Sequence, residues 1–137
     1  MRTIHIFRTT LSPTRWHITG THDNATTREW YEELPNYQRQ NLWNYLKRSP
    51  GESAEAAPTL MRMAWSSVAA LTIASLQDVL NLGREARMNV PGRAGGNWSW
   101  RFSEDMLSRA SFESLRELTE SSKRSAGPQY QSRQIPA

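Results

Sequence analysis

A histidine and an aspartate in the loop after a short β-prone run are the side chains best placed to do chemistry. The run covers residues 16–19 and stops at Gly20, and His22 and Asp23 follow. In parallel α/β folds, active sites form at the carboxyl ends of strands, so this position favours a ligand site. Gly20 lets the chain leave strand geometry, which both side chains need in order to face one ligand. The alternative is a surface turn in which Asp23 caps the following helix.

A second group of polar residues lies in and before a glycine-containing loop. Arg87, Asn89 and Pro91 of this loop are candidates for ligand contact, and Asp78 precedes them. For Asp78 and Arg87 we slightly favour an ion pair or a helix cap that holds the loop over direct contact with a ligand. The spacing alone leaves both interpretations open.

The size and composition of the chain exclude several classes of protein. With 137 residues and 15.7 kDa the chain suits one domain, whereas a complete (β/α)8 barrel needs about 250 residues. No apolar run reaches the roughly 18 residues of a membrane span, so we expect no membrane partner. Cysteine is absent, which excludes disulfides and permits a reducing compartment, and we expect a cytoplasmic protein.

The charge distribution argues against nucleic-acid binding. Although the net charge is +4, 13 acidic side chains are interleaved among 17 basic ones, as on an ordinary solvated surface. His5 and His17 form no pair with metal-ligand spacing, so we predict no metal. The glycines of the late loop fit no phosphate-binding pattern, and we predict no cofactor.

Most of the predicted elements are helices. We expect residues 1–16 to be atypical and disordered or mis-started, residues 17–120 to form the folded part, and residues 121–137 to be a disordered tail. Residues 72–76 fit either a buried strand or the end of a helix. Helices are predicted over 26–34, over 37–46 with Asn36 as cap, over 58–71 with Pro58 in the first turn, over 77–82 closed by Gly83, and over 103–120 with Ser103 as cap.

Long stretches of the chain resemble glycoside hydrolase family 77, the amylomaltases and disproportionating enzymes. The resemblance rests on TGTHDN at 19–24, LQDVLNLG at 76–83, EARMNVPG at 85–92 and NWSWRF at 97–102. Ala25 and Asn81 depart from the family's usual residues, and the His22–Asp23 pair is intact. The similarity, which covers roughly residues 18–118, implies the C-terminal part of a (β/α)8 barrel, predominantly helical with one or two short parallel strands.

The resemblance also implies an activity. Family members are 4-α-glucanotransferases, which move a segment of an α-1,4-glucan to a new acceptor with retention of configuration. Asp23 corresponds to the carboxylate that stabilises the transition state, and His22, Arg87, Asn89 and Pro91 correspond to substrate-binding positions. Hydrogen bonds to the sugar 2-hydroxyl strengthen as the ring approaches an oxocarbenium ion, which lowers the barrier. The implied ligand is an α-1,4-glucan or maltooligosaccharide.

The two other carboxylates of the reaction have no counterpart here. A retaining mechanism needs a nucleophile and an acid/base, which the family carries on earlier strands, and this sequence has no Asp or Glu before Asp23. We therefore expect a truncated chain that is inactive alone, marginally stable, and dependent on the missing N-terminal portion of the barrel. The alternatives are a remnant that binds maltooligosaccharides and a helical interaction module.

The aromatic residues Trp98, Trp100 and Phe102 stand at alternate positions after the late loop. Such a stripe is more often packed than exposed. We therefore expect packing rather than a platform for sugar rings.

Overall fold

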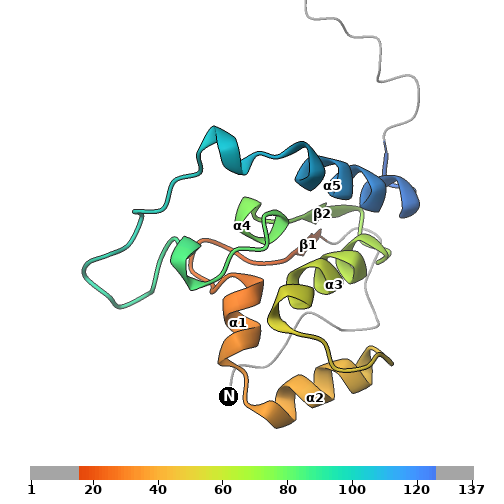
Figure 1. Ribbon diagram of the computed structural model, residues 1–137, viewed down its shortest axis with the longest axis horizontal. Coiled ribbons are helices and arrows are strands. Elements are labelled where there is room, and N and C mark those ends of the chain that lie inside the picture. The colour runs from red at the N-terminus through yellow and green to blue at the C-terminus, as the bar shows by residue number, and fades with distance from the viewer. Residues whose placement is uncertain (1–15, 126–137) are drawn as a thin grey trace, which may run out of the picture.

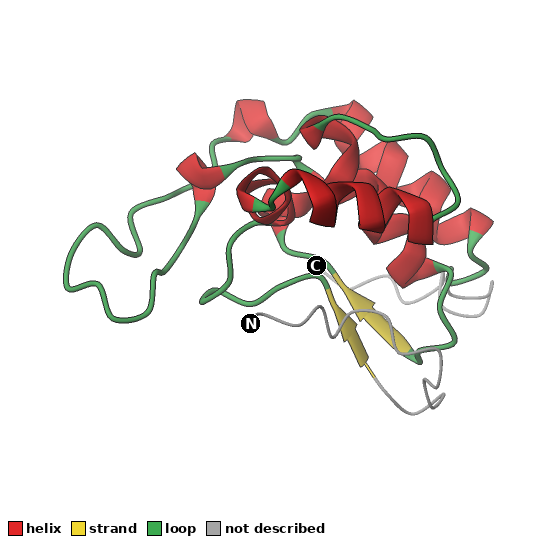
Figure 2. Ribbon diagram, turned by 90° about the horizontal axis from the view of Figure 1, so that it is seen from below, coloured by secondary structure: helices red, strands yellow, loops and turns green. Residues whose placement is uncertain are grey.

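Helices cover one face of a two-stranded parallel sheet (Figures 1 and 2). The computed structural model describes residues 16–125, so the expectations for residues 1–15 and 126–137 lie outside the described residues. None of the described helices is long and apolar enough to cross a membrane. In chain order the elements are β1 (Trp16–Ile18), α1 (Thr27–Glu33), α2 (Asn36–Tyr45), α3 (Ser53–Trp65), β2 (Leu71–Ile73), α4 (Leu76–Val79), η2 (Arg84–Ala86), η3 (Glu104–Met106) and α5 (Arg109–Ser121).

The two strands run in the same direction and lie side by side. Trp16 pairs with Leu71 and Ile18 with Ile73, and all four side chains are more than 40% exposed on one face of the sheet. Of the ambiguous segment 72–76, the first two residues belong to β2, which confirms the expectation of short parallel strands, and the last residue begins α4. Because the strands are parallel, the loops that follow them leave from the same end of the sheet.

Local capping sets the start of α1 as predicted. The Thr26 side chain accepts a hydrogen bond from the Glu29 backbone N–H, which satisfies a donor of the first turn. The prediction that Asn36 caps α2 is wrong, because Pro35 occupies the cap position and Asn36 lies inside the helix. Pro35 fits there because its carbonyl accepts bonds from the backbone of the first turn, while its missing N–H is not required.

Helix α3 differs most from its predicted range. It begins at Ser53 rather than at Pro58, which lies inside the helix, and it ends at Trp65 before the turn into β2. A proline inside a helix leaves the carbonyl four residues earlier without its usual partner. Here that carbonyl belongs to Ala54, and Asn81 Nδ2 donates to it at 2.8 Å. A contact from a distant segment thus compensates the proline.

The C-terminal end of α4 and the start of α5 also differ from expectation. Gly83 does not close α4; Asn81 adopts the left-handed conformation with φ 55°, and Leu82 N bonds to the Gln77 carbonyl, as in a Schellman ending. Ser103 begins only the short η3. The cap of α5 is Ser108, whose side chain accepts from Ser111 N.

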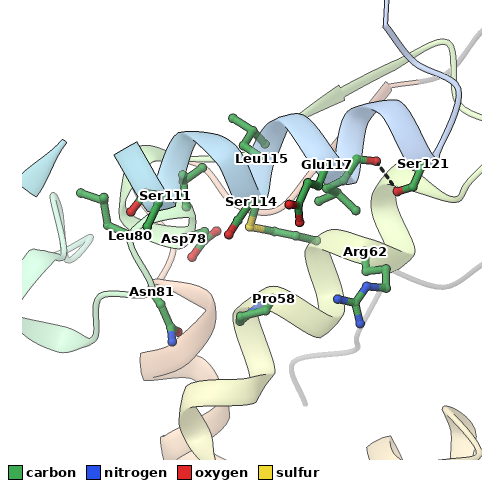
Figure 3. Close-up of a pocket in the computed structure, with 14 residues that line it drawn as sticks. Pro58, Arg62, Asp78, Leu80, Asn81, Ser111, Ser114, Leu115, Glu117 and Ser121 are labelled. Carbon is green, nitrogen blue, oxygen red and sulfur yellow. Dashed lines mark hydrogen bonds between the residues drawn. The ribbon is translucent and has the colours of Figure 1, made fainter. Parts of the chain in front are cut away.

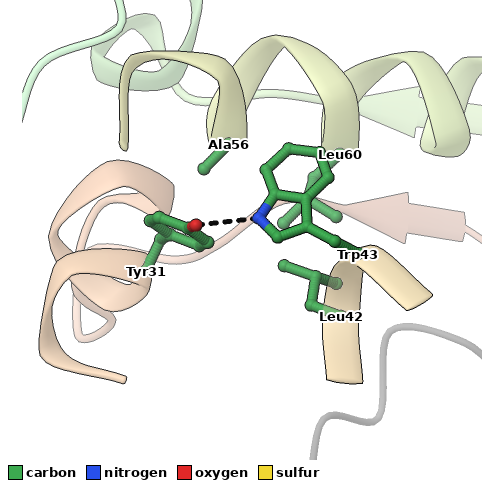
Figure 4. Packing of buried hydrophobic residues seen from close by; sticks show 5 residues of the cluster. All are labelled: Tyr31, Leu42, Trp43, Ala56 and Leu60. Atoms are coloured by element: carbon green, nitrogen blue, oxygen red, sulfur yellow. Dashed lines mark hydrogen bonds between the residues drawn. The ribbon is translucent and has the colours of Figure 1, made fainter. Parts of the chain in front are cut away.

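The main core lies where α1, α2 and α3 meet (Figure 4). Trp43 is 1% exposed, and its indole N–H donates to the Tyr31 hydroxyl at 2.8 Å. The Tyr31 hydroxyl in turn donates to the Gly51 carbonyl at 2.7 Å, so the buried polar atoms of this aromatic pair are satisfied. Leu42, Ala56 and Leu60 complete this cluster.

Helix α5 is attached to α3 mainly through its far end. It contains no buried residue, but Leu115 and Leu118 pack against a second cluster formed by Met61, Ala64 and Trp65. Just beyond α5, the guanidinium of Arg124 donates to three carbonyls that follow from the end of α3, those of Trp65, Ser67 and Ala69. A cation at the C-terminus of a helix is favourable because it satisfies free carbonyls there.

Candidate functional site

A small pocket of about 160 Å³ opens where the loops after β1 and β2 meet. Residues from the first loop, including His22, form one side, and Ser75, Gln77 and Arg87 contribute from the second part of the chain. The pocket therefore lies at the carboxyl end of the parallel strands, where the sequence predicts a ligand site.

Three of the predicted site residues meet directly beside this pocket. Asp23 Oδ1 accepts a hydrogen bond from Asn89 Nδ2 at 2.6 Å and lies 3.3 Å from His22 Nε2. The side chains of His22 and Asp23 are 57% and 48% exposed, so both can exchange water for a ligand. The capping alternative for Asp23 is wrong, because Thr26 caps α1.

Trp98 adds an aromatic surface to this group. Its ring centroid lies 5.1 Å from that of His22, with an interplanar angle of 37°. Trp98 has a positive φ of 59°, and its N–H donates to the Met88 carbonyl at 2.7 Å, which holds this uncommon conformation. The prediction of a packed stripe is wrong for Trp98 and Phe102, which are 51% and 53% exposed. The loop turns at Trp98 and so breaks the regular alternation of a strand.

Although Arg87 lines the pocket, its guanidinium is directed into the protein, toward Glu29. Its side chain is 12% exposed, and Nη1 lies 3.3 Å from Glu29 Oε1. Nε donates to the Asn89 carbonyl at 3.0 Å, and Nη2 donates to the Asp23 carbonyl at 3.4 Å. This arrangement matches the interpretation that Arg87 holds the loop.

Asp78 is a buried carboxylate that hydrogen-bonds to both ends of the loop that carries His22 and Asp23. It is 2% exposed, and Oδ2 accepts from the Thr19 hydroxyl at 2.5 Å while Oδ1 accepts from Thr27 N at 2.8 Å. One carboxylate thus binds the chain on both sides of the loop. Asp78 acts as the predicted cap, and the ion-pair partner of Arg87 is Glu29 instead.

Pro91, which the sequence predicts as a site residue, lies away from the pocket, whereas Glu29, which it does not predict, supports the site. Pro91 is exposed further along the loop and is not among the residues that line the pocket. Glu29 is not among the residues singled out from the sequence, and its contact with Arg87 joins positions 58 residues apart. No local spacing could reveal that contact. In residues 16–125, no group of three His, Asp or Glu is placed to hold a metal.

A larger cavity of about 710 Å³ lies between α3, α4 and α5. Ser114 and Glu117 of α5 lie opposite Pro58 and Arg62 of α3 (Figure 3). Asp78 lines this cavity, but the residues predicted to contact the ligand do not.

Comparison with known proteins identifies the family. The profile of the family described as 4-α-glucanotransferase, glycoside hydrolase family 77, matches residues 9–108, beginning and ending earlier than the resemblance predicted. A 4-α-glucanotransferase of Synechocystis is 49% identical over 89 residues, which is 65% of this chain and 17% of that protein. The chloroplastic/amyloplastic enzyme of Solanum tuberosum is 44% identical over 97 residues, or 71% of this chain and 16% of that protein.

A solved structure agrees with the sequence comparisons. The amylomaltase of Streptococcus agalactiae in complex with acarbose matches with a TM-score of 0.74 and 33% identity, over 81% of this chain and 22% of that one. The chain thus spans about a fifth of the length of the relatives it matches. Because the family profile matches residues 9–108 and the fold matches that of an amylomaltase, the chain belongs to the 4-α-glucanotransferase family, glycoside hydrolase family 77.

Proposed function

We propose that this chain supplies the transition-state-stabilising part of a 4-α-glucanotransferase site. The observation that carries the proposal is the cluster of His22, Asp23 and Asn89 at the carboxyl end of two parallel strands, in a member of this family. The substrate is an α-1,4-glucan or maltooligosaccharide, and the reaction moves a glucan segment to a new acceptor.

In this mechanism Asp23 binds hydroxyls of the sugar at the cleavage point. As the ring flattens toward an oxocarbenium ion, its 2-hydroxyl becomes a better donor, and an exposed carboxylate binds it more strongly than in the ground state. Asn89 and His22 hold the same oxygen of Asp23, so the carboxylate is oriented before the substrate arrives, which avoids a reorganisation cost.

The nucleophile and the acid/base come, in this proposal, from sequence outside these 137 residues. The exposed apolar face formed by Trp16, Ile18, Leu71 and Ile73 supports the idea, because inward-facing strand residues of a (β/α)8 barrel pack against further strands. Residues 17–120 are then the C-terminal part of such a barrel.

A chimaera tests the proposal. Residues 18–118 replace the matching segment of the Streptococcus agalactiae amylomaltase, and glucose release from maltotriose is measured. We expect the chimaera to be active and Asp23→Asn within it to lose on the order of a hundredfold in kcat or more, the scale of removing one preorganised transition-state contact. A folded chimaera in which Asp23→Asn has no effect on kcat contradicts the proposal.

A second function, maltooligosaccharide binding without transfer, is favoured by one contact. Trp98 lies half exposed against His22, and an aromatic ring beside polar groups suits a sugar. Titration of the chain with acarbose, followed by tryptophan fluorescence, tests it, and His22→Ala serves as the comparison. Saturable binding that His22→Ala weakens supports this function, and an unchanged signal rejects it.

A further inference from the structure

Glu29 on α1 is a buried carboxylate that the proposed mechanism does not use. Its side chain is 3% exposed, and Oε2 has no hydrogen-bond partner within the described residues. Burying a charged group with unused acceptor capacity is unfavourable, and such groups commonly belong to functional sites.

The partner of Glu29 is Arg87. The distance from Oε1 to Arg87 Nη1 is 3.3 Å, and the Arg87 side chain is only 12% exposed. Arg84 lies 3.9 Å from the same oxygen but is 77% exposed, so solvent weakens that pair. Glu29 thus mainly neutralises and orients a guanidinium that is itself largely buried.

Arg87 in turn donates hydrogen bonds to two residues of the proposed site. Its Nε donates to the Asn89 carbonyl at 3.0 Å and its Nη2 to the Asp23 carbonyl at 3.4 Å. The Asn89 side chain then donates to Asp23 Oδ1 at 2.6 Å. Because the planar guanidinium has a fixed fork of donors, its position at Glu29 determines where the other two bonds can form.

We propose that Glu29 is a positioning residue of the glucan site, acting through Arg87 and Asn89 to set Asp23. The proposal rests on the proposed function of Asp23, and it adds a residue from the helix behind the site. Without the Glu29 charge, Arg87 gains rotamer freedom and turns toward solvent or the pocket that it lines. Asn89 then loses its anchor, and Asp23 loses a donor.

The first experiment needs no sugar and uses the full 137-residue chain. Glu29→Gln keeps the shape of the side chain and removes its charge. We expect the Asn89 side-chain amide signal in ¹H–¹⁵N spectra to move toward that of a free asparagine, and hydrogen exchange at the Trp98 amide to rise on the order of tenfold. The matched control is Glu32→Gln, which removes an exposed carboxylate of the same helix that pairs with Arg28. Equal behaviour of the two variants overturns the proposal.

A second variant keeps this experiment decisive if Glu29→Gln does not fold. The double variant Glu29→Met with Arg87→Met replaces the buried pair by apolar side chains, which proteins often tolerate without loss of stability. It too should release the Asn89 amide. An Asn89 signal identical to that of the parent chain overturns the proposal.

The second experiment distinguishes positioning from a general structural role. Acarbose affinity is compared in the parent chain, Glu29→Gln, Asn89→Ala and the variant that combines Glu29→Gln with Asn89→Ala. We expect Glu29→Gln to weaken binding on the order of tenfold, and the combined variant to bind no more weakly than Asn89→Ala, since both act through one contact. Additive losses overturn the proposal. If the parent chain alone does not bind acarbose, the second proposed function, binding without transfer, fails. The chimaera then still tests glucan transfer, and the first experiment still decides whether Glu29 sets Asn89.

Discussion

Removing the Asp78 carboxylate should destabilise the loop that carries His22 and Asp23. In Asp78→Ala, the hydroxyl of Thr19 and the backbone N–H of Thr27 both lose their acceptor. Loss of a helix-capping bond costs about 1 kcal/mol, and loss of a bond to a charged group costs about 1.5 to 3 kcal/mol. Relief from burying the charge offsets part of this. We expect the free energy of unfolding to fall by about 2 to 3 kcal/mol.

Urea denaturation followed by far-UV circular dichroism measures this loss. Asp78→Asn should cost only about 1 kcal/mol, because its amide oxygen can still accept from Thr27 N. The control Asp105→Ala removes an exposed aspartate of η3 and should change stability by less than about 0.5 kcal/mol. If Asp78→Ala unfolds at the same urea concentration as Asp105→Ala, with the same dependence of the unfolding free energy on urea, the hydrogen bonds of Asp78 contribute nothing to stability. That result refutes the expected loss.

Three further predictions concern other contacts. Tyr31→Phe leaves the buried indole N–H of Trp43 without its acceptor and should cost about 1 to 3 kcal/mol in urea denaturation. Asn81→Gly keeps the left-handed backbone but loses the bond to α3, so it should cost about 1 kcal/mol, and Asn81→Ala should cost more in the same assay. A hydrogen bond from Arg28 holds the pKa of Glu32 below its ordinary value. Its stabilisation is therefore present above the ordinary glutamate pKa and is lost as the pH falls through the lowered one, so the small Tm advantage over Glu32→Gln should vanish in acid.

The elements predicted correctly from sequence depend on neighbours in the chain. The first strand, which ends at Ile18, and the helix that begins after Thr26 lie close to their expected positions and depend on bonds that span a few residues. The short parallel strands are expected from the family resemblance instead, because the pairing of Trp16 with Leu71 joins distant positions. From the residues alone, reasoning succeeds where both partners of a contact lie within one turn.

The elements predicted wrongly depend on distant partners or on competing local signals. Pro58 indicates the start of a helix when only its own segment is considered. In the structure it lies inside α3, because Asn81, 27 residues beyond Ala54, bonds to the carbonyl that the proline frees. Ser103 and Ser108 are both acceptable caps for the last helix, and in the structure Ser103 begins the short η3 while Ser108 caps α5.

The site shows how resemblance identifies positions without assigning them roles. Both Asp23 and Arg87 fall in family motifs, yet the Asp23 side chain is 48% exposed and the Arg87 side chain is 12% exposed. The Arg87 guanidinium already donates from each of its three nitrogens, to Glu29, Asn89 and the Asp23 backbone, so the protein fixes its orientation. We therefore propose that direct contact with the glucan is made by Asp23 and His22, while Arg87 fixes the loop around them.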